Sequence, residues 1–213
     1  MLIIGSSFYS IQAQDISLKA GALFYNLYVN DTLKYNNIEY TFDPSYSLDL
    51  SADFRIANIW SLSTKLGIKT KSGQADGIIL GQTNTGEIVT ASKEFSFVNV
   101  LGGIHLLYDI KLSPIITLKP YAGINLEFNV SEKFNTTRTS EFFNPDNLYD
   151  SSDLHVQYNN SGLSTTLGFR IQFDNLFIES EYEWELYRMC IYEVGSSKSG
   201  VFKLLIGYNF YSF

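Results

Sequence analysis

The chain has 213 residues, a formal net charge of −7 and 45% hydrophobic residues, with 15 Tyr, 16 Phe, 4 Pro and 1 Cys. This length supports one domain with a full core or one membrane barrel. The acidic balance argues against a nucleic-acid partner, which favours a basic face, and the single cysteine, Cys190, excludes an internal disulfide. The sequence has no apolar run of about 18 residues, so any membrane span must consist of strands.

The first residues, MLIIGSSFYSIQAQ, resemble an export signal. Residues 1–11 would supply its apolar core, and Ala13 is a small residue suited to cleavage before Asp15. No Lys or Arg precedes the apolar stretch, which leaves open a start upstream of Met1; a frayed terminus or a first strand is the alternative. We expect a signal-peptide remnant at 1–14, with no lipoprotein anchor, and a barrel domain at 15–213.

From residue 16 onward, apolar and polar residues alternate with a period of two, which predicts strands with two different faces. Each predicted strand is longer than the usual length of about 5–6 residues. Each is also long enough to cross an outer membrane, which takes about 9–11 tilted residues. The eight predicted strands are residues 16–29, 44–56, 60–71, 95–110, 117–130, 162–173, 176–189 and 201–211.

The connections alternate between short and long. Residues 57–59, 111–116 and 174–175 form short turns, whereas 30–43, 72–94, 131–161 and 190–200 are long and polar. Outer-membrane barrels have this pattern, with tight periplasmic turns and larger outer loops. Residues 77–92 also alternate in part, and we expect them to prolong two strands beyond the membrane as a hairpin. Its edge could recruit another strand.

The two parities of these strands differ in character. One is apolar, with residues such as Leu48, Ile104, Leu126, Leu167 and Ile206, and the other carries acids and bases in nearly equal numbers. Charges buried in a narrow barrel persist only when they are paired, so we predict that the polar parity lines a lumen. The predicted lumen charge network is Lys19, Asp49, Asp53, Arg55, Lys65, Lys69, His105, Asp109, Lys119, Glu127, Arg170, Glu179, Glu181, Glu183, Glu185 and Lys203.

The stretch FIESEYEWELY, residues 177–187, has a glutamate at every second position from 179 to 185. A two-residue turn at 174–175 would set Arg170 opposite Glu179. The same ladder sets Gly168, Thr166 and Ser164 opposite the next three glutamates. We also expect Asp109 to lie opposite Lys119, and Lys203 to reach Glu185. A soluble sandwich or lipocalin-like barrel, with the apolar parity inside, is the alternative fold.

Aromatic residues gather at the two ends of the predicted strands, as expected for rings that settle at both lipid–water interfaces. The short-turn end has Trp60, Phe173, Tyr208, Phe210 and Tyr211, and the long-loop end has Tyr28, Tyr46, Phe128, Trp184 and Tyr187.

The closing stretch KLLIGYNFYSF is similar to the last strand of bacterial outer-membrane barrels, which ends in an aromatic residue. Gly207-Tyr208-Asn209-Phe210 resembles the usual GYxF ending, and three residues extend past it. Together with IQAQD at 11–15 and eight strands, the chain resembles the PorT-like outer-membrane β-barrel family of Bacteroidota. The resemblance implies recognition of the last strand by the barrel-insertion machinery and, for some members, a role in secretion.

Two histidines are candidates for chemistry. His105 falls on the lumen parity near Asp109, where we expect a hydrogen-bonded structural histidine, because a metal site needs more ligands. His155 lies in the longest loop, near Ser151 and Asp153, and this group is similar to the rim of barrels that modify lipid A. Spacing in a loop does not establish a triad, which is defined by geometry, so we expect no catalysis.

The same loop holds two further candidates. NPDNLYDSSD, residues 144–153, offers oxygen ligands for calcium but lacks the spacing of a calcium-binding loop, so we expect a solvated turn. Phe142 and Phe143 would contact a partner or the membrane rim, unless they pack within the loop.

Eight strands leave an interior just wide enough for side chains to fill it. We therefore predict an all-β, eight-stranded antiparallel up-and-down transmembrane barrel in the bacterial outer membrane, with a plugged, charge-paired lumen. Its outer loops would act in surface binding, envelope integrity, or an accessory role in secretion or assembly. We expect no enzyme activity and no cofactor; the partners are outer-membrane lipid, the insertion machinery and a surface protein. The alternatives are a narrow small-solute or cation channel and a lipid A-modifying enzyme.

Overall fold

The computed structural model describes residues 15–29, 39–82, 88–138, 161–186 and 197–212. The predicted signal-peptide remnant, the pair Phe142 and Phe143, the stretch 144–153 and His155 lie outside these residues. Within the described ranges, no helix has the length and apolar character needed to cross a membrane.

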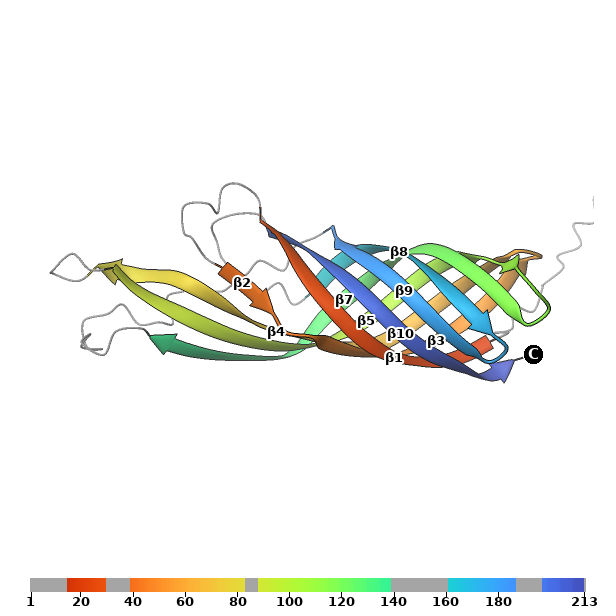
Figure 1. The fold of residues 1–213 in the computed structure, drawn as a ribbon, viewed down its shortest axis with the longest axis horizontal. Helices are drawn as coiled ribbons and strands as arrows, with labels where there is room; N and C mark the ends of the chain where they lie inside the picture. Colours follow the sequence, from red (N-terminus) through yellow and green to blue (C-terminus); the bar gives the residue numbers. More distant parts are fainter. Residues whose placement is uncertain (1–14, 30–38, 83–87, 139–160, 187–196, 213) are drawn as a thin grey trace, which may run out of the picture.

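All the described elements of regular structure are strands, and eight long ones form a closed antiparallel ring (Figure 1). The ring order is β4-β3-β1-β10-β9-β8-β7-β5, and pairing between β4 and β5 closes it. Closure satisfies the backbone groups of every strand, as lipid requires. The bounds are β1 Asp15–Val29, β2 Glu39–Phe42, β3 Ser45–Ala57, β4 Trp60–Gln82, β5 Ile88–Tyr108, β6 Ile110–Lys111, β7 Ile116–Arg138, β8 Ser161–Phe173, β9 Leu176–Glu185 and β10 Ser197–Ser212.

The tight turn between β8 and β9 fixes their register. Asp174 has a positive φ of 49°, in the left-handed region that aspartate tolerates better than most residues. The turn sets Phe173 opposite Leu176 and Arg170 opposite Glu179. The predicted register of this hairpin, including the three small residues opposite the other glutamates, is therefore confirmed.

Four strands, β4, β5, β7 and β10, are clearly longer than predicted, and β10 begins at Ser197 instead of residue 201. β4 and β7 have 23 residues each and β5 has 21, against 10 in β9. Residues 77–92 prolong β4 and β5 as expected, because Ile78 pairs with Ala91 and Gln82 with Ile88. The prediction of a loop from residue 131 was wrong, since β7 continues to Arg138. Above the membrane neither strand face has to be uniformly apolar, so the two-residue period weakens there.

Two smaller differences concern a predicted loop and the end of a predicted strand. Residues 39–42, predicted as part of a loop, form β2, which pairs with Gly73–Asp76 of β4. The predicted strand 95–110 is interrupted at Asp109, after which β6 pairs with the start of β7.

Together, β2 and the outer parts of β4, β5 and β7 project beyond the ring (Figure 1). We call this the projecting sheet: residues 39–42, 72–82, 88–98 and 131–138.

The exposed and buried faces of the strands settle the orientation of the side chains. Leu167 is 57% exposed and Ile206 is 64% exposed, whereas Glu181 is fully buried. An exposed apolar surface this extensive marks contact with lipid. The apolar parity therefore faces outward, and the alternative of a soluble barrel with that parity inside is wrong.

Aromatic residues predicted at the two strand ends also face outward. Tyr187 and the side chain of Tyr28 lie outside the described part of the structure. The exposed members are Trp60, Phe173, Tyr208, Phe210 and Tyr211 at one end, and Tyr46, Phe128 and Trp184 at the other.

Candidate functional site

Three glutamates of β9 are at the centre of the lumen charge network. Glu179 accepts hydrogen bonds from Lys19 Nζ at 2.6 Å and from Arg170 Nε at 2.9 Å. The guanidinium of Arg170 also contacts Asp53 Oδ2 at 2.7 Å and lies 4.3 Å from the centroid of the Phe177 ring. Each of these charges is thus matched by an opposite charge from another strand.

Glu181 occupies the middle of the network and has three partners. Its carboxylate accepts hydrogen bonds from Lys203 Nζ at 2.7 Å, from Lys65 Nζ at 3.2 Å and from the Tyr121 hydroxyl at 3.0 Å. A buried carboxylate is stable only when its oxygens are satisfied in this way. The tyrosine was not among the predicted lumen residues.

Glu183 completes the row. It contacts Lys203 Nζ at 2.5 Å and Lys69 Nζ at 3.2 Å, and it accepts a hydrogen bond from Ser164 Oγ at 2.5 Å. Lys69 also pairs with Glu127. The row of buried carboxylates therefore continues across to β7.

The prediction that Lys203 reaches Glu185 was wrong. Lys203 lies directly opposite Glu181 in the ladder between β9 and β10, and its ammonium is shared between Glu181 and Glu183. The long connection before β10 sets no register, so the pairing could not be derived from a turn. Glu185 is half-buried at the end of β9.

Charged residues near the short-turn end form looser pairs. Lys119 lies 4.0 Å from Asp109, as predicted from the turn, and 3.8 Å from Asp15. The side chain of Arg55 is 49% exposed and lies 3.8 Å from Asp109, so it lies at the rim and not inside the lumen. It occupies one of the last positions of β3, where the lumen opens to solvent.

His105 is a buried, hydrogen-bonded histidine as expected, whereas Asp49 lacks, within the described ranges, the partner expected of a lumen charge. His105 shares a hydrogen bond of 3.0 Å with Asn125 Oδ1, and its ring stacks on Tyr121 with centroids 5.3 Å apart. The hydrogen bond of His105 is thus made with Asn125 and not with Asp109. Asp49 is fully buried, and neither carboxylate oxygen has a hydrogen-bond partner among the described residues. No group of three His, Cys, Asp or Glu side chains in the described ranges could hold a metal.

The lumen also contains large apolar side chains, which the prediction from charge patterning missed. They fill the space between the ion pairs, and their presence could have been read from the inward parity of the strands. The fully buried ones are Leu23, Leu101, Leu107, Phe177 and Leu205.

An aromatic layer lies above the charges, where the closed barrel joins the projecting sheet. The rings of Tyr25 and Phe42 have centroids 5.8 Å apart, as do those of Phe42 and Phe95, and Phe95 stacks on Phe97 at 5.5 Å. The ammonium of Lys71 is buried and lies 5.1 Å from the Tyr25 centroid, within the range of a cation–π interaction. Apolar rings thus follow the ion pairs toward the outer end.

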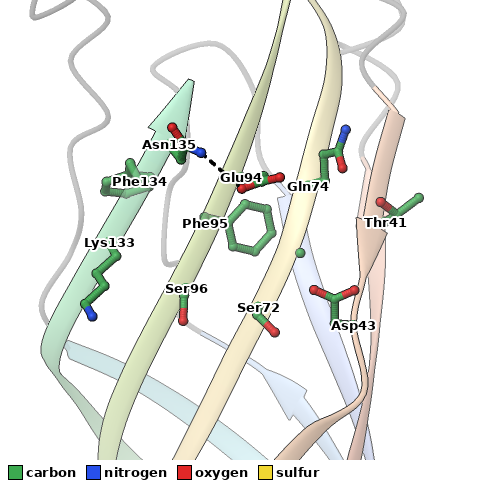
Figure 2. Close-up of a pocket in the computed structure, with 11 residues that line it drawn as sticks. Thr41, Asp43, Ser72, Gln74, Glu94, Phe95, Ser96, Lys133, Phe134 and Asn135 are labelled. Carbon is green, nitrogen blue, oxygen red and sulfur yellow. Dashed lines mark hydrogen bonds between the residues drawn. The ribbon is translucent and has the colours of Figure 1, made fainter. Parts of the chain in front are cut away.

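A polar groove of about 640 Å³ crosses the projecting sheet. Figure 2 shows side chains from four strands around it, with the Asn135 amide donating a hydrogen bond of 3.4 Å to Glu94. None of its residues was a predicted site residue, although Phe95 and Ser96 belong to the predicted strand 95–110. The lining residues are Thr41, Asp43, Ser72, Gly73, Gln74, Glu94, Phe95, Ser96, Lys133, Phe134 and Asn135.

Asp76 lies next to the groove and has a lowered pKa. The Ser92 hydroxyl and then the Gln74 amide hold the pKa of Asp76 below its ordinary value by hydrogen bonding to the carboxylate. The amide nitrogen of Gln74 lies 2.7 Å from Asp76 Oδ1. These bonds link two residues of β4 to β5 near the bulge that follows Ala75.

A family model described as an outer membrane protein beta-barrel domain matches residues 12–188, which is most of the chain. No curated protein is similar enough to be matched.

Solved structures give distant likenesses. Neisserial surface protein A is 16% identical, with 93% of this chain and 99% of that chain covered and a TM-score of 0.47. OprG from Pseudomonas aeruginosa is 14% identical, with 95% and 98% covered and a TM-score of 0.40. Ail from Yersinia pestis, solved in complex with the heparin analogue sucrose octasulfate, is 11% identical, with 93% and 100% covered and a TM-score of 0.41.

Proposed function

The chain belongs to the outer membrane protein beta-barrel domain family, and from that premise we propose that this outer-membrane β-barrel protein acts through its projecting sheet and outer loops. The roles that fit are surface binding, envelope integrity and an accessory role in secretion or assembly. Within this family, the closing stretch with Gly207-Tyr208-Asn209-Phe210 favours a PorT-like member from Bacteroidota. The same stretch supports recognition by the barrel-insertion machinery.

Unequal strand length is the observation that carries this proposal. A tilted strand crosses an outer membrane in about 9–11 residues, and β9, with 10 residues, is of that length. β4 and β7 have 23 residues each, so roughly half of each strand lies beyond the membrane on the same estimate. Long paired strands outside a membrane present a rigid surface to a partner, which a closed barrel does not otherwise need.

The contents of the lumen support the choice of the outer surface over a channel. Fully buried ion pairs along β9 are surrounded by large apolar side chains and covered by an aromatic layer. Eight strands leave no water-filled space beyond that taken by the side chains. An ion would have to separate Lys203 from Glu181 and Glu183, which is costly for a buried pair.

The candidate for a lipid-modifying activity, His155, lies outside the described residues, and its spacing from Ser151 and Asp153 within one loop does not establish a catalytic triad. We propose that the protein is not an enzyme. Lipid A isolated from cells with and without the barrel should have the same mass spectrum, and His155→Ala should change nothing. A mass change that disappears with His155→Ala would contradict the proposal.

The proposal is tested by removing the tip of the projecting sheet. Replacing residues 78–90 with Asn-Gly keeps a hairpin turn between β4 and β5 and leaves the ring intact. We expect wild-type amounts of heat-modifiable barrel in the outer membrane but loss of its surface partners, identified by cross-linking on living cells. Lys111→Ala, at the opposite end, is the control and should keep every partner. Retention of all partners by the shortened barrel would contradict the proposal.

A further inference from the structure

We propose that the groove of the projecting sheet binds the sugar headgroup of a glycolipid in the same membrane. This inference rests on the proposed function, in that it names a ligand class for the projecting sheet. The reasons are the arrangement of the polar side chains, their height above the apolar surface, and their balance of charges and hydrogen-bonding groups.

The eight polar side chains of the groove form two rows across β4, β5 and β7, and the rows end at Thr41 in β2 and at Asp43 just after β2. In the outer row, Thr41 pairs with Gln74, Gln74 with Glu94, and Glu94 with Asn135. In the inner row, the Asp43 amide bonds the Ser72 carbonyl, Ser72 pairs with Ser96, and Ser96 pairs with Lys133. Figure 2 shows the two rows one above the other.

Both rows lie on the lipid-facing side of the strands. Ser72 and Gln74 have the same parity in β4 as the exposed Leu66 and Ile68. In β5, Ser96 and Glu94 share the parity of Ile104. The bulge in β7 near Val130 restores the match, because Lys133 and Asn135 lie opposite these two residues of β5. The groove therefore continues the surface that contacts lipid.

The height of the groove corresponds to the headgroup layer. The outward row next to the groove on its membrane side joins Thr70, Val98 and Ser131, and it still contains an aliphatic side chain. The inner polar row is two residues further along each strand, or about 7 Å at 3.3 Å per residue. The headgroup region of a bilayer adds about 5–8 Å to each side of the hydrocarbon core. A headgroup beside the barrel would thus lie against these rows.

The chemistry of the rows matches hydroxyl groups better than phosphate. They contain two carboxylates, two amides, three hydroxyls and one ammonium. Phosphate headgroups are bound by clusters of Lys and Arg, but here only Lys133 is basic and the acids outnumber it. Sugar hydroxyls both donate and accept, and carboxylates and amides offer both kinds of partner.

Existing contacts hold the polar groups of the outer row in place. Asn135 donates to Glu94 at 3.4 Å, and Gln74 donates to Asp76 at 2.7 Å, which directs its amide. The residues stand on paired strands and not in loops, so little side-chain and backbone freedom remains to be lost on binding.

The test uses the purified full-length barrel in phosphatidylcholine nanodiscs that also contain one probe lipid. The probes are digalactosyldiacylglycerol, which carries a neutral disaccharide, phosphatidylglycerol, which is anionic, and phosphatidylethanolamine. Native mass spectrometry measures the lipid retained by the barrel. We expect about tenfold greater retention of the disaccharide lipid than of the other two. Equal retention of all lipids, or preference for either phospholipid, would overturn the proposal.

Matched variants locate the site. The triple variant Gln74→Ala, Glu94→Ala and Asn135→Ala should abolish the preference, whereas Asn58→Ala with Lys111→Ala, exposed at the opposite end, should keep it. Exposed positions such as these tolerate substitution, and heat-modifiable mobility verifies the fold of each variant. A preference unchanged in the triple variant would contradict the site.

A final comparison separates the membrane source from a soluble one and this inference from the proposed function. Free digalactose should not displace the lipid at equal concentration, and displacement would contradict a membrane glycolipid. The 78–90 replacement leaves both rows intact. It should therefore keep the lipid preference even if it loses surface partners, so the two proposals can fail separately.

Discussion

Lys203 neutralises two buried glutamates at once, at 2.7 Å from Glu181 and 2.5 Å from Glu183. Lys203→Met keeps the volume of the side chain but removes one of the two described cations at each carboxylate. Glu181 then keeps Lys65 alone, and Glu183 keeps Lys69 alone. Breaking a buried pair in this way costs about 3–5 kcal/mol. We expect a fall of that size in the free energy of unfolding, measured by urea denaturation in lipid vesicles. Arg55→Ala, which removes an exposed partner, should cost at most about 1 kcal/mol.

Gly168 makes room for Tyr121, whose hydroxyl donates to Glu181. A Cβ on residue 168 would lie 2.6 Å from Tyr121 Oη and from the Ser180 carbonyl oxygen. We expect Gly168→Ala to lower the free energy of unfolding by about 1–3 kcal/mol through overpacking. Gly102→Ala is the control, because its Cβ would meet only the Lys65 carbonyl oxygen, at 3.9 Å. An equal effect of both substitutions would show that the space beside Tyr121 is not what requires glycine at position 168.

The parity of the strands predicted which residues line the lumen. It did not predict which of these residues contact one another. Arg170 and Glu179 could be paired in advance because a two-residue turn fixes their register. Lys203 follows a long connection that sets no register, and Tyr121 reaches Glu181 from β7, a strand that does not pair with β9. Parity also predicts the position of an inward residue and not its partner, which is why the contact of His105 with Asn125 was missed.

Among the elements, the β8–β9 hairpin depends on one backbone conformation. Asp174 has a φ of 49°, and β-branched residues are strained there. We expect Asp174→Val to lower the stability of the barrel by about 1–2 kcal/mol and Asp174→Gly to leave it unchanged or higher. The heat-modifiable gel shift, followed against temperature, measures both. If Asp174→Val left the stability of the barrel unchanged, the strand register would not depend on this turn.

The pairing of β4 with β5 beyond the ring should depend on pH through Asp76. Its pKa lies below the ordinary 3.8 because of hydrogen bonds from Ser92 and Gln74. A lowered pKa contributes stability above the unfolded value, and that stability is lost as pH falls through the folded value. We expect amide protection factors of residues 88–92 to be constant from neutral pH to about 4 and to fall below it. Asp76→Asn should remove the dependence; the same fall in that variant would contradict its cause.

The elements inside the membrane were predictable and those outside it were less so, for one physical reason. Lipid on one side and ion pairs on the other impose a strict alternation, as in Leu66 to Lys69. Beyond the membrane both faces of a strand can carry polar residues, and the outward positions change from Ile68 to Ser72 and Gln74. The strand continues there without its sequence signature, so 131–138 resembled a loop.

At the scale of the whole molecule, the region inside the membrane differs from the region beyond it. Inside the membrane, ion pairs and apolar side chains fill the ring, and this filling stabilises the fold. Beyond the membrane, β4, β5 and β7 continue as a paired sheet with a polar groove at its base. The family match establishes an outer-membrane barrel, and the proposed function assigns its activity to the projecting sheet.

Planar-bilayer conductance of the purified barrel tests most directly whether the lumen is closed. With Lys203 held between Glu181 and Glu183, we predict no steady current in wild type, and none in the variant Glu181→Gln with Glu183→Gln. A stable, cation-selective current that decreases when these two glutamates are replaced would contradict the closed lumen and favour a narrow channel.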